Sequence, residues 1–79
     1  MPVPKGASEL DDLVLRVDYA STTINYYGHA PVGSATSDAS WRIKRETLDS
    51  QGRTTAIEFA GSSANFGQIW DNRAVLIYG

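Results

Sequence analysis

The sequence predicts a small all-β domain, an antiparallel sandwich or a partly open barrel of about five to six strands. Three observations support this prediction. Short segments alternate between apolar and polar residues, turn-forming residues separate these segments, and a single short stretch has helical spacing. The chain of 79 residues is long enough for one domain, which we expect over residues 10–79, after an extended arm over residues 1–9.

The N-terminal arm is expected because residues 1–9 contain Pro2, Pro4 and Gly6 and few side chains that could be buried. Proline lacks the backbone N–H that a sheet requires, and two prolines favour an extended chain. Two interpretations remain open at this stage: a frayed terminus, or an arm that contacts a neighbouring subunit.

Residues 13–19 are predicted to form the first strand, because apolar and polar side chains alternate along them. The apolar positions, which we expect on a half-buried face, are Leu13, Leu15, Val17 and Tyr19. The β-branched and aromatic residues from Thr22 to Gly28 indicate a second strand. Since the connection between them is short, the two strands are predicted to pair as a hairpin.

Residues 28–40 have no periodicity and contain small residues together with Pro31 and Gly33, so they are predicted to form a loop. A loop of this length in so short a chain is typical of a functional or disordered segment. Its small side chains would allow it to lie flat against another surface.

A second hairpin is predicted from residues 41–48 and 53–60, which alternate on either side of the turn signal Asp49-Ser-Gln-Gly52. Glycine is expected at the last of these positions because the turn requires a positive φ there.

The C-terminal part begins with a predicted loop over residues 61–67. A single helical turn would then fit the spacing of Phe66, Ile69, Trp70 and Arg73. Residues 74–78 are apolar at both alternating positions and are predicted to form the final strand. Such a strand is either central in a sheet or covered on its second face by a partner.

The composition excludes several kinds of site. The chain has no cysteine, which excludes disulfides, thiolate metal sites and cysteine nucleophiles. His29 is the single histidine, so one chain cannot build a metal site from histidines alone. We therefore expect no metal and no cofactor. Of the devices that commonly stabilise short chains, oligomerisation remains.

Charge and hydropathy restrict the partners. A net charge of −2 gives no overall positive field that would attract nucleic acid or anionic lipid. No apolar run approaches the ~20 residues needed to span a bilayer, and the N-terminus lacks the apolar stretch of a signal peptide. We expect synthesis in a cytoplasm, and neither a membrane nor nucleic acid as a partner.

The sequence offers little for catalysis. It contains no Gly-x-Ser-x-Gly motif, and His29 lies in no recognised Ser-His-Asp order. A core of this size does not easily enclose a pocket of ~300 Å³. We expect no enzyme activity.

Two binding functions are compatible with parts of the sequence: binding of single-stranded nucleic acid and binding of a carbohydrate or receptor. Residues 41–45 interleave aromatic and basic residues, as single-strand nucleic-acid binders do. Alternation, however, puts Trp41 on the face opposite to Arg42 and Lys44, and pairing of the cations with acidic residues across the hairpin is the more economical account. A small barrel that binds single-stranded nucleic acid and a carbohydrate- or receptor-binding module with an exposed Trp or Tyr remain as alternatives.

The compact segment Trp70-Asp-Asn-Arg73 allows two interpretations. In the first, Trp70 fills the core while Arg73 pairs with Asp71 or with loop carbonyls. In the second, Arg73 lies at a subunit contact, where arginine and aromatic residues are enriched.

An ordered series of short motifs runs from residue 26 to residue 78. The motifs are Gly28-x-Ala30-x-x-Gly33-x-Ala35-Thr36-Ser37, Trp41-x-Ile43-x-Arg45, Phe59-Ala60-Gly61 and Trp70-Asp71-x-Arg73, followed by Leu76 and Tyr78. This series resembles a group of small structural proteins of tailed bacteriophages. The direct junction of Ala60 and Gly61 and the proline-containing arm depart from that group, and the resemblance implies no catalytic residues.

The resemblance implies a virion component that is built in multiple copies. We expect a non-enzymatic structural protein, made in the host cytoplasm and located in the virion, that assembles as a homo-oligomer and contacts other capsid, neck or tail proteins. It would either decorate the capsid or form part of the neck, tail or fibre attachment. The candidate contact residues are Pro2, Pro4, Lys5, His29, Pro31, Val32, Trp70, Arg73, Val75 and Ile77.

Overall fold

The structure, a computed structural model, describes residues 12–79. The predicted arm and its candidate contact residues Pro2, Pro4 and Lys5 lie outside the described residues. The described elements are β1 (Leu13–Asp18), β2 (Ile24–Pro31), β3 (Ala39–Leu48), β4 (Thr54–Phe59), β5 (Gln68–Ile69) and a 3₁₀ turn, η1 (Trp70–Asn72).

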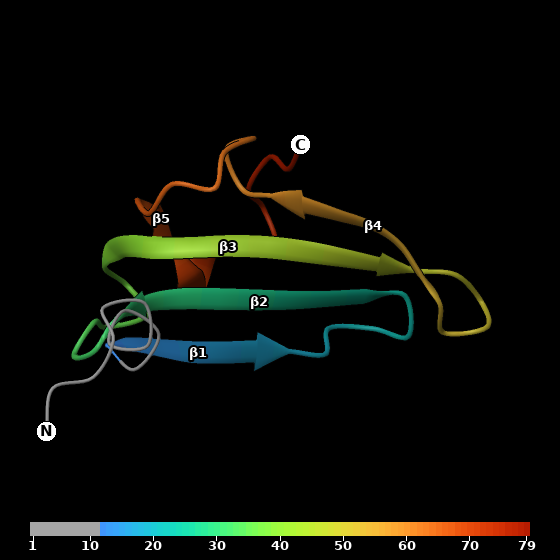
Figure 1. The fold of residues 1–79 in the computed structure, drawn as a ribbon, viewed down its shortest axis with the longest axis horizontal. Helices are drawn as coiled ribbons and strands as arrows, with labels where there is room; N and C mark the ends of the chain where they lie inside the picture. The colour runs from blue at the N-terminus through green and yellow to red at the C-terminus, as the bar shows by residue number, and fades with distance from the viewer. Residues whose placement is uncertain (1–11) are drawn as a thin grey trace, which may run out of the picture.

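The strands form an antiparallel sheet in the order β1-β2-β3-β4, and the short β5 pairs with one end of β3 (Figure 1). The sheet does not close on itself. The all-β prediction, including its partly open form, is therefore confirmed. Both predicted hairpins are also present, since β1 pairs with β2 and β3 pairs with β4.

The turn between β3 and β4 forms where its residue types predict it. Gly52 has a φ of +80°, a conformation that glycine adopts without a steric penalty. The backbone N–H of Gly52 donates to the carbonyl of Asp49 at 3.0 Å, which closes the turn.

β2 is longer than predicted. It continues through Pro31, so His29 and Pro31 belong to a strand rather than to a loop, and the loop is reduced to residues 32–38. The prediction of a loop over residues 28–40 was wrong at both ends. Its small residues at positions 28 and 30 are strand residues whose size is set by what packs over them.

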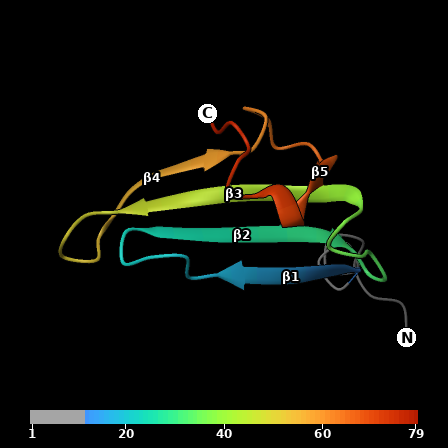
Figure 2. The same cartoon turned by 180° about the vertical axis from the view of Figure 1, so that it is seen from behind.

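The core lies on one face of the sheet, where the rings of Trp41 and Trp70 pack with their centroids 5.8 Å apart. Trp41 is 0 % exposed and Trp70 5 %. The turn η1 carries Trp70 across β2 and β3, on the face seen in Figure 2. A Cβ atom on Gly28 would lie 2.5 Å from the Trp70 ring and 3.0 Å from the Trp41 ring. We call this the covered face.

The faces of β1 are the reverse of the expected ones. The register pairs Val14 with Ala30, and Val14 is the β1 residue that packs against the core. Leu15 and Val17 are instead 56 % and 40 % exposed, and Tyr19 is 76 % exposed just beyond the strand. Alternation indicates which residues share a face, but it does not reveal which face the rest of the chain covers.

The predicted final strand over residues 74–78 was also wrong. After η1 the chain turns, and its one bridge joins Tyr78 to Ala60. Leu76 and Tyr78 pack against the core, whereas Val75 and Ile77 are each 81 % exposed. Residues 77–79 hydrogen-bond to residues 59–61 at the end of β4 without forming a full strand, so Leu76 and Tyr78 reach the core while the side chains between them are exposed.

Replacing Gly28 by alanine should destabilise the domain by about 2–3 kcal/mol, because the added methyl group would collide with both indole rings. Urea unfolding followed by tryptophan fluorescence measures this change. Gly33→Ala is the matched control: its Cβ would meet no atom within 4 Å, and the strain of its φ of +92° corresponds to about 1 kcal/mol. Equal losses in the two variants would contradict the close packing of the rings.

Candidate functional site

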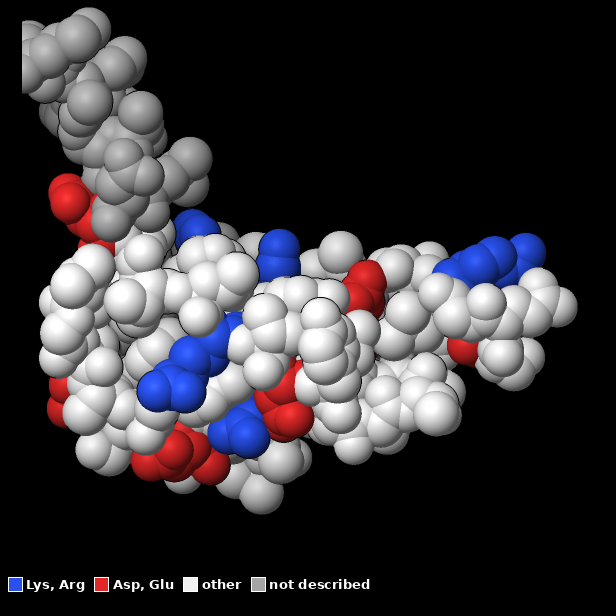
Figure 3. Space-filling view, turned by 90° about the horizontal axis from the view of Figure 1, so that it is seen from below, with Lys and Arg blue, Asp and Glu red and all other residues white. Residues whose placement is uncertain are grey.

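The second face of the sheet, which we call the open face, has no described helix or strand packed over it (Figure 1); the Phe66 ring, from the loop after β4, approaches it at Arg42. Strand register and alternation define its residues. They are Leu13, Leu15 and Val17 of β1, Asn25, Tyr27, His29 and Pro31 of β2, Arg42, Lys44 and Glu46 of β3, and Ile57 and Phe59 of β4. Seen from the β1 side, most of the molecular surface is uncharged, and basic and acidic groups are scattered through it (Figure 3).

A pocket of about 170 Å³ lies on the open face and is lined by His29, Arg42, Lys44 and Phe59. The register explains how these residues meet. His29 is directly opposite Arg42, and Lys44 is directly opposite Phe59. Arg42 and Lys44 are two residues apart on one strand, so their side chains leave the same face of the sheet. We call this group of four residues the cationic pocket.

The cationic pocket contains two positively charged side chains that have no described carboxylate within ion-pair distance. Within residues 12–79, Arg42 and Lys44 form no ion pair. Each instead lies over an aromatic ring: Arg42 is 5.0 Å from the centroid of Phe66, and Lys44 is 5.7 Å from that of Tyr27. A cation–π contact compensates a positive charge much less than a carboxylate would.

His29 responds to the same field. Partial burial, and then the charges of Arg42 and Lys44, lower the pKa of His29 below its usual value of 6.5. Its imidazole is therefore neutral at pH 7. An anion in the pocket would offset the two neighbouring charges and favour protonation of the ring.

The nearest described acid on the open face, Glu46, already has partners. Its carboxylate accepts hydrogen bonds from the Asn25 amide at 3.0 Å, from the Tyr27 hydroxyl at 2.7 Å and from Thr54. These three bonds lower the pKa of Glu46 to about 2, the bond from Thr54 having the largest effect. The bond to Glu46 also raises the pKa of the Tyr27 phenol. The charge of Lys44 also helps to lower the pKa of Glu46, but Glu46 forms no ion pair with Arg42 or Lys44.

The pocket is suited to binding rather than to proton transfer. Among the described residues, His29 has no serine or carboxylate within hydrogen-bonding distance, so no nucleophile–base pair is assembled there. Across residues 12–79, no three His, Asp or Glu side chains gather in a way that could hold a metal ion. The chemistry that these four side chains offer is recognition of an anionic group beside an apolar wall.

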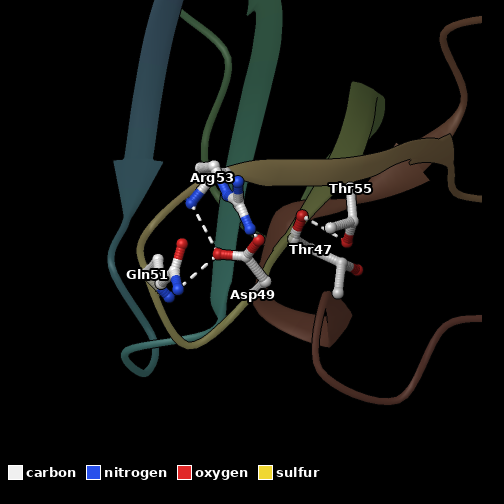
Figure 4. A network of polar contacts seen from close by, with 5 residues as sticks. All are labelled: Thr47, Asp49, Gln51, Arg53 and Thr55. Carbon is white, nitrogen blue, oxygen red and sulfur yellow. Dashed lines mark hydrogen bonds and ion pairs between the residues drawn. The ribbon is translucent and has the colours of Figure 1, made fainter.

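The densest polar network lies elsewhere, at the β3–β4 turn (Figure 4). The carboxylate of Asp49 accepts bonds from the backbone N–H groups of Gln51 and Arg53 at 2.9 and 3.0 Å, and from the Arg53 guanidinium at 2.8 Å. These bonds lower the pKa of Asp49. The Asp49 carboxylate is occupied by hydrogen bonds from the same turn. The network therefore stabilises the hairpin and is not a binding site for a ligand.

The segment Trp70–Arg73 agrees with the first interpretation in one respect and differs in another. Trp70 does fill the core. The carboxylate partner of Arg73, however, is Asp18 at 2.9 Å and not Asp71. The guanidinium also lies 4.6 Å from the centroid of the Trp70 ring, and its Nη1 donates to the Trp70 carbonyl. This pair fastens the C-terminal segment to β1.

The other candidate contact residues are dispersed. Val32 is exposed in the loop over residues 32–38, and Val75 and Ile77 are exposed in the C-terminal segment. The loop itself is held to its own domain, since Trp41 Nε1 donates to the Ala35 carbonyl at 2.9 Å and Asp71 N donates to the Thr36 carbonyl at 3.1 Å. The structure brings His29 alone of these candidates into the cationic pocket.

Sequence reasoning missed Arg42, Lys44 and Phe59 as members of a site. The alternation of residues 41–47 did place both cations on one face. The expected pairing with acids across the hairpin holds for Arg45, whose guanidinium is 3.0 Å from Glu58 on the covered face, and not for Arg42 or Lys44. The signal that could have revealed the site was the short distance in sequence between two cations that share a face.

No family model, no curated protein and no solved structure matches this chain. Of the helical residues in the described part of the chain, none form a stretch with the length and apolar character that crossing a bilayer requires.

The Glu46 network predicts a specific acid sensitivity. The pKa of Glu46 is about 2 in the folded state and near 4.5 when unfolded, so its stabilising bonds are fully present above pH 4.5 and are lost as the pH falls towards 2. Glu46→Gln should therefore flatten the decline of unfolding free energy between pH 5 and 2, measured by urea unfolding. Asp12→Asn, at an exposed carboxylate, is the control and should leave the slope unchanged. A wild-type slope in Glu46→Gln would contradict the assigned bonds.

Proposed function

We propose that the chain is a non-enzymatic structural subunit of a tailed-bacteriophage virion, acting through repeated assembly as a capsid decoration protein or as part of the neck, tail or fibre attachment. The observation that carries the proposal is the open face, a sheet surface that displays aliphatic and cationic side chains with no described layer over it. Its partners are further copies of itself and other virion proteins, and its location is the virion, after synthesis in the host cytoplasm.

The open face supports assembly because a β-sheet normally buries at least one face in a second layer and exposes only polar residues on the other. Here the second face carries exposed aliphatic residues at Leu15, Val17 and Ile57. Burial of apolar area stabilises by about 25 cal/mol per Å². Covering this face with a partner recovers stabilisation that the isolated domain lacks.

The resemblance of the ordered motifs to small phage structural proteins supports the virion as the place of assembly. The residues of those motifs have structural roles in this fold. Gly28, Trp41 and Trp70 form the core packing, and Arg73 fastens the last segment to β1.

The carbohydrate-binding alternative depended on an exposed Trp or Tyr. Trp41 and Trp70 are buried, so neither ring offers a platform for a sugar. Tyr19 is exposed beyond β1 and close enough to Tyr27 to help raise the pKa of that phenol, but Lys44 already lies over the Tyr27 ring. The structural proposal is therefore the one that we carry forward.

Mass spectrometry of gradient-purified particles, with immunogold labelling of the assembled virion, tests the proposal. We expect the chain in the particles at a stoichiometry of many copies per virion. A protein that is expressed during infection but absent from purified particles would overturn the virion role.

Deletion of residues 1–9 tests the arm. Because residues 1–9 contain few side chains that could be buried, we expect the deletion to leave the midpoint of thermal unfolding nearly unchanged and to reduce incorporation into particles several-fold. Replacement of the same residues by a Gly-Ser segment of equal length is the control for chain length. An equal loss of folding and of incorporation would contradict a contact role for this segment.

A further inference from the structure

We propose that copies of this chain stack head to tail, with the Asp71 carboxylate of one copy seated in the cationic pocket of the next. The inference rests on the proposed function, because it describes how copies contact one another in the assembly.

The receiving site is the cationic pocket. Its volume of about 170 Å³ is sufficient for a carboxylate-bearing side chain. Arg42 and Lys44 both lack an acidic partner among residues 12–79, and His29 adds a third donor nitrogen. Arginine beside an apolar wall, here Phe59, is typical of the centre of a protein–protein interface.

The donated group is the carboxylate of Asp71. Seven of the nine acidic residues are described, and five of these have polar partners: Asp18, Asp38, Asp49, Glu46 and Glu58. Asp12 and Asp71 are exposed, and no side-chain bond joins either of them to another described residue. Asp71 belongs to η1, on the side of the sheet opposite to the cationic pocket.

The positions of the two groups favour stacking. η1 packs over β2 and β3 on the covered face (Figure 2), and the cationic pocket lies on β2, β3 and β4 on the open face. Donor and acceptor therefore lie back to back on either side of the same strands. A copy displaced along the sheet normal would bring its η1 turn to the pocket of its neighbour. Such a contact is heterologous and repeats from copy to copy.

The surroundings of the two groups match as well. Val75, whose backbone N–H donates to the Asn72 carbonyl next to Asp71, is 81 % exposed, and the open face exposes Leu15 and Val17 beside the pocket. Both surfaces thus combine a charge with neighbouring aliphatic side chains, and the charges are opposite. An ion pair placed among aliphatic contacts is shielded from water, which strengthens it and fixes the register of the contact.

Protein is favoured over single-stranded nucleic acid as the occupant. Nucleic-acid platforms present free aromatic faces to the bases, whereas here Lys44 lies over Tyr27 and Arg42 over Phe66. The net charge of −2 opposes a polyanion and is compatible with a carboxylate from another copy.

Sedimentation velocity of the purified full chain, over a range of concentrations and salt, tests the inference. We expect reversible association that weakens with salt. Lys44→Glu or Asp71→Lys should each raise the dissociation constant by about tenfold or more, equivalent to about 1.4 kcal/mol. The combined Lys44→Glu/Asp71→Lys variant should recover most of the association, because the two charges are exchanged and the pair is restored. Circular dichroism and thermal unfolding establish that each variant is folded.

Asp12→Lys is the matched control, since it makes the same charge change at the other exposed carboxylate and should not have the effect of Asp71→Lys. Equal effects of Asp12→Lys and Asp71→Lys, a chain that stays monomeric, or a double variant no better than the singles would each overturn the inference. None of these outcomes removes the chain from particles, so the mass spectrometry above judges the proposed function separately.

A second experiment tests single-stranded DNA as the occupant of the pocket, with a fluorescein-labelled (dT)20 oligonucleotide as the probe. Anisotropy should show no binding at physiological salt. Binding of this strand that Lys44→Glu abolishes would overturn the assignment of the pocket to a carboxylate of another copy.

The neutral His29 adds a pH signature to the contact. The charged groups that face it are Arg42 and Lys44 of β3, and its β1 neighbour, Leu15, is uncharged. A carboxylate in the pocket raises the pKa of His29, so proton uptake accompanies association. Association should strengthen as the pH falls from 7.5 to 6, and His29→Gln should remove this dependence. Association that weakens over that range would contradict the placement of the carboxylate beside His29.

Discussion

The packing of Trp41 and Trp70 over Gly28 is the constraint on which the rest of the structure depends. The two rings require a strand position without a side chain, and β2 supplies it at residue 28. Once Trp70 is fixed there, η1 must cross β2 and β3, and the C-terminal segment follows on the same side. Among residues 12–79, no helix or strand then crosses the other face. One tight contact thus decides which face is covered and which is left open.

The charges are distributed in accordance with this asymmetry. On the covered face, two arginines have both an aromatic and an acidic neighbour: Arg45 lies over Tyr78 and pairs with Glu58, and Arg73 lies over Trp70 and pairs with Asp18. On the open face, Arg42 and Lys44 lie over aromatic rings and form no ion pair with another described residue, and Glu46 is bonded to neutral side chains. Partly exposed ion pairs contribute little to stability, about 0–1 kcal/mol each, so the covered pairs serve chiefly to orient the last segment.

The sequence predicted the local structure well and the three-dimensional arrangement poorly. Both hairpins followed from alternation and from turn residues such as Gly52, whose conformational requirement is local. The choice of face on β1 was not predictable, because Leu15 and Val14 differ little in character and the covering segment is more than fifty residues away. The prediction of a final strand was wrong for a related reason. Val75 to Tyr78 are β-forming residues, but the packing of Trp70 against Trp41 directs the chain across the sheet before it reaches them. The cationic pocket needs the register of three strands, which no single segment encodes.

The difference between the covered face and the open face affects how a chain of 79 residues can form a stable assembly. A standard protein–protein contact buries about 800 Å² on each partner, and the accessible surface of this chain is 5176 Å². A copy that contacts one neighbour through its open face and another through its η1 side would bury roughly a third of its surface in two such contacts. Each sheet would then lie between two layers, as a sheet in a larger domain does. In the proposed stack, a neighbouring copy would take the place of a second layer over the open face, and the exposed aliphatic residues of that face would be core positions of the assembly.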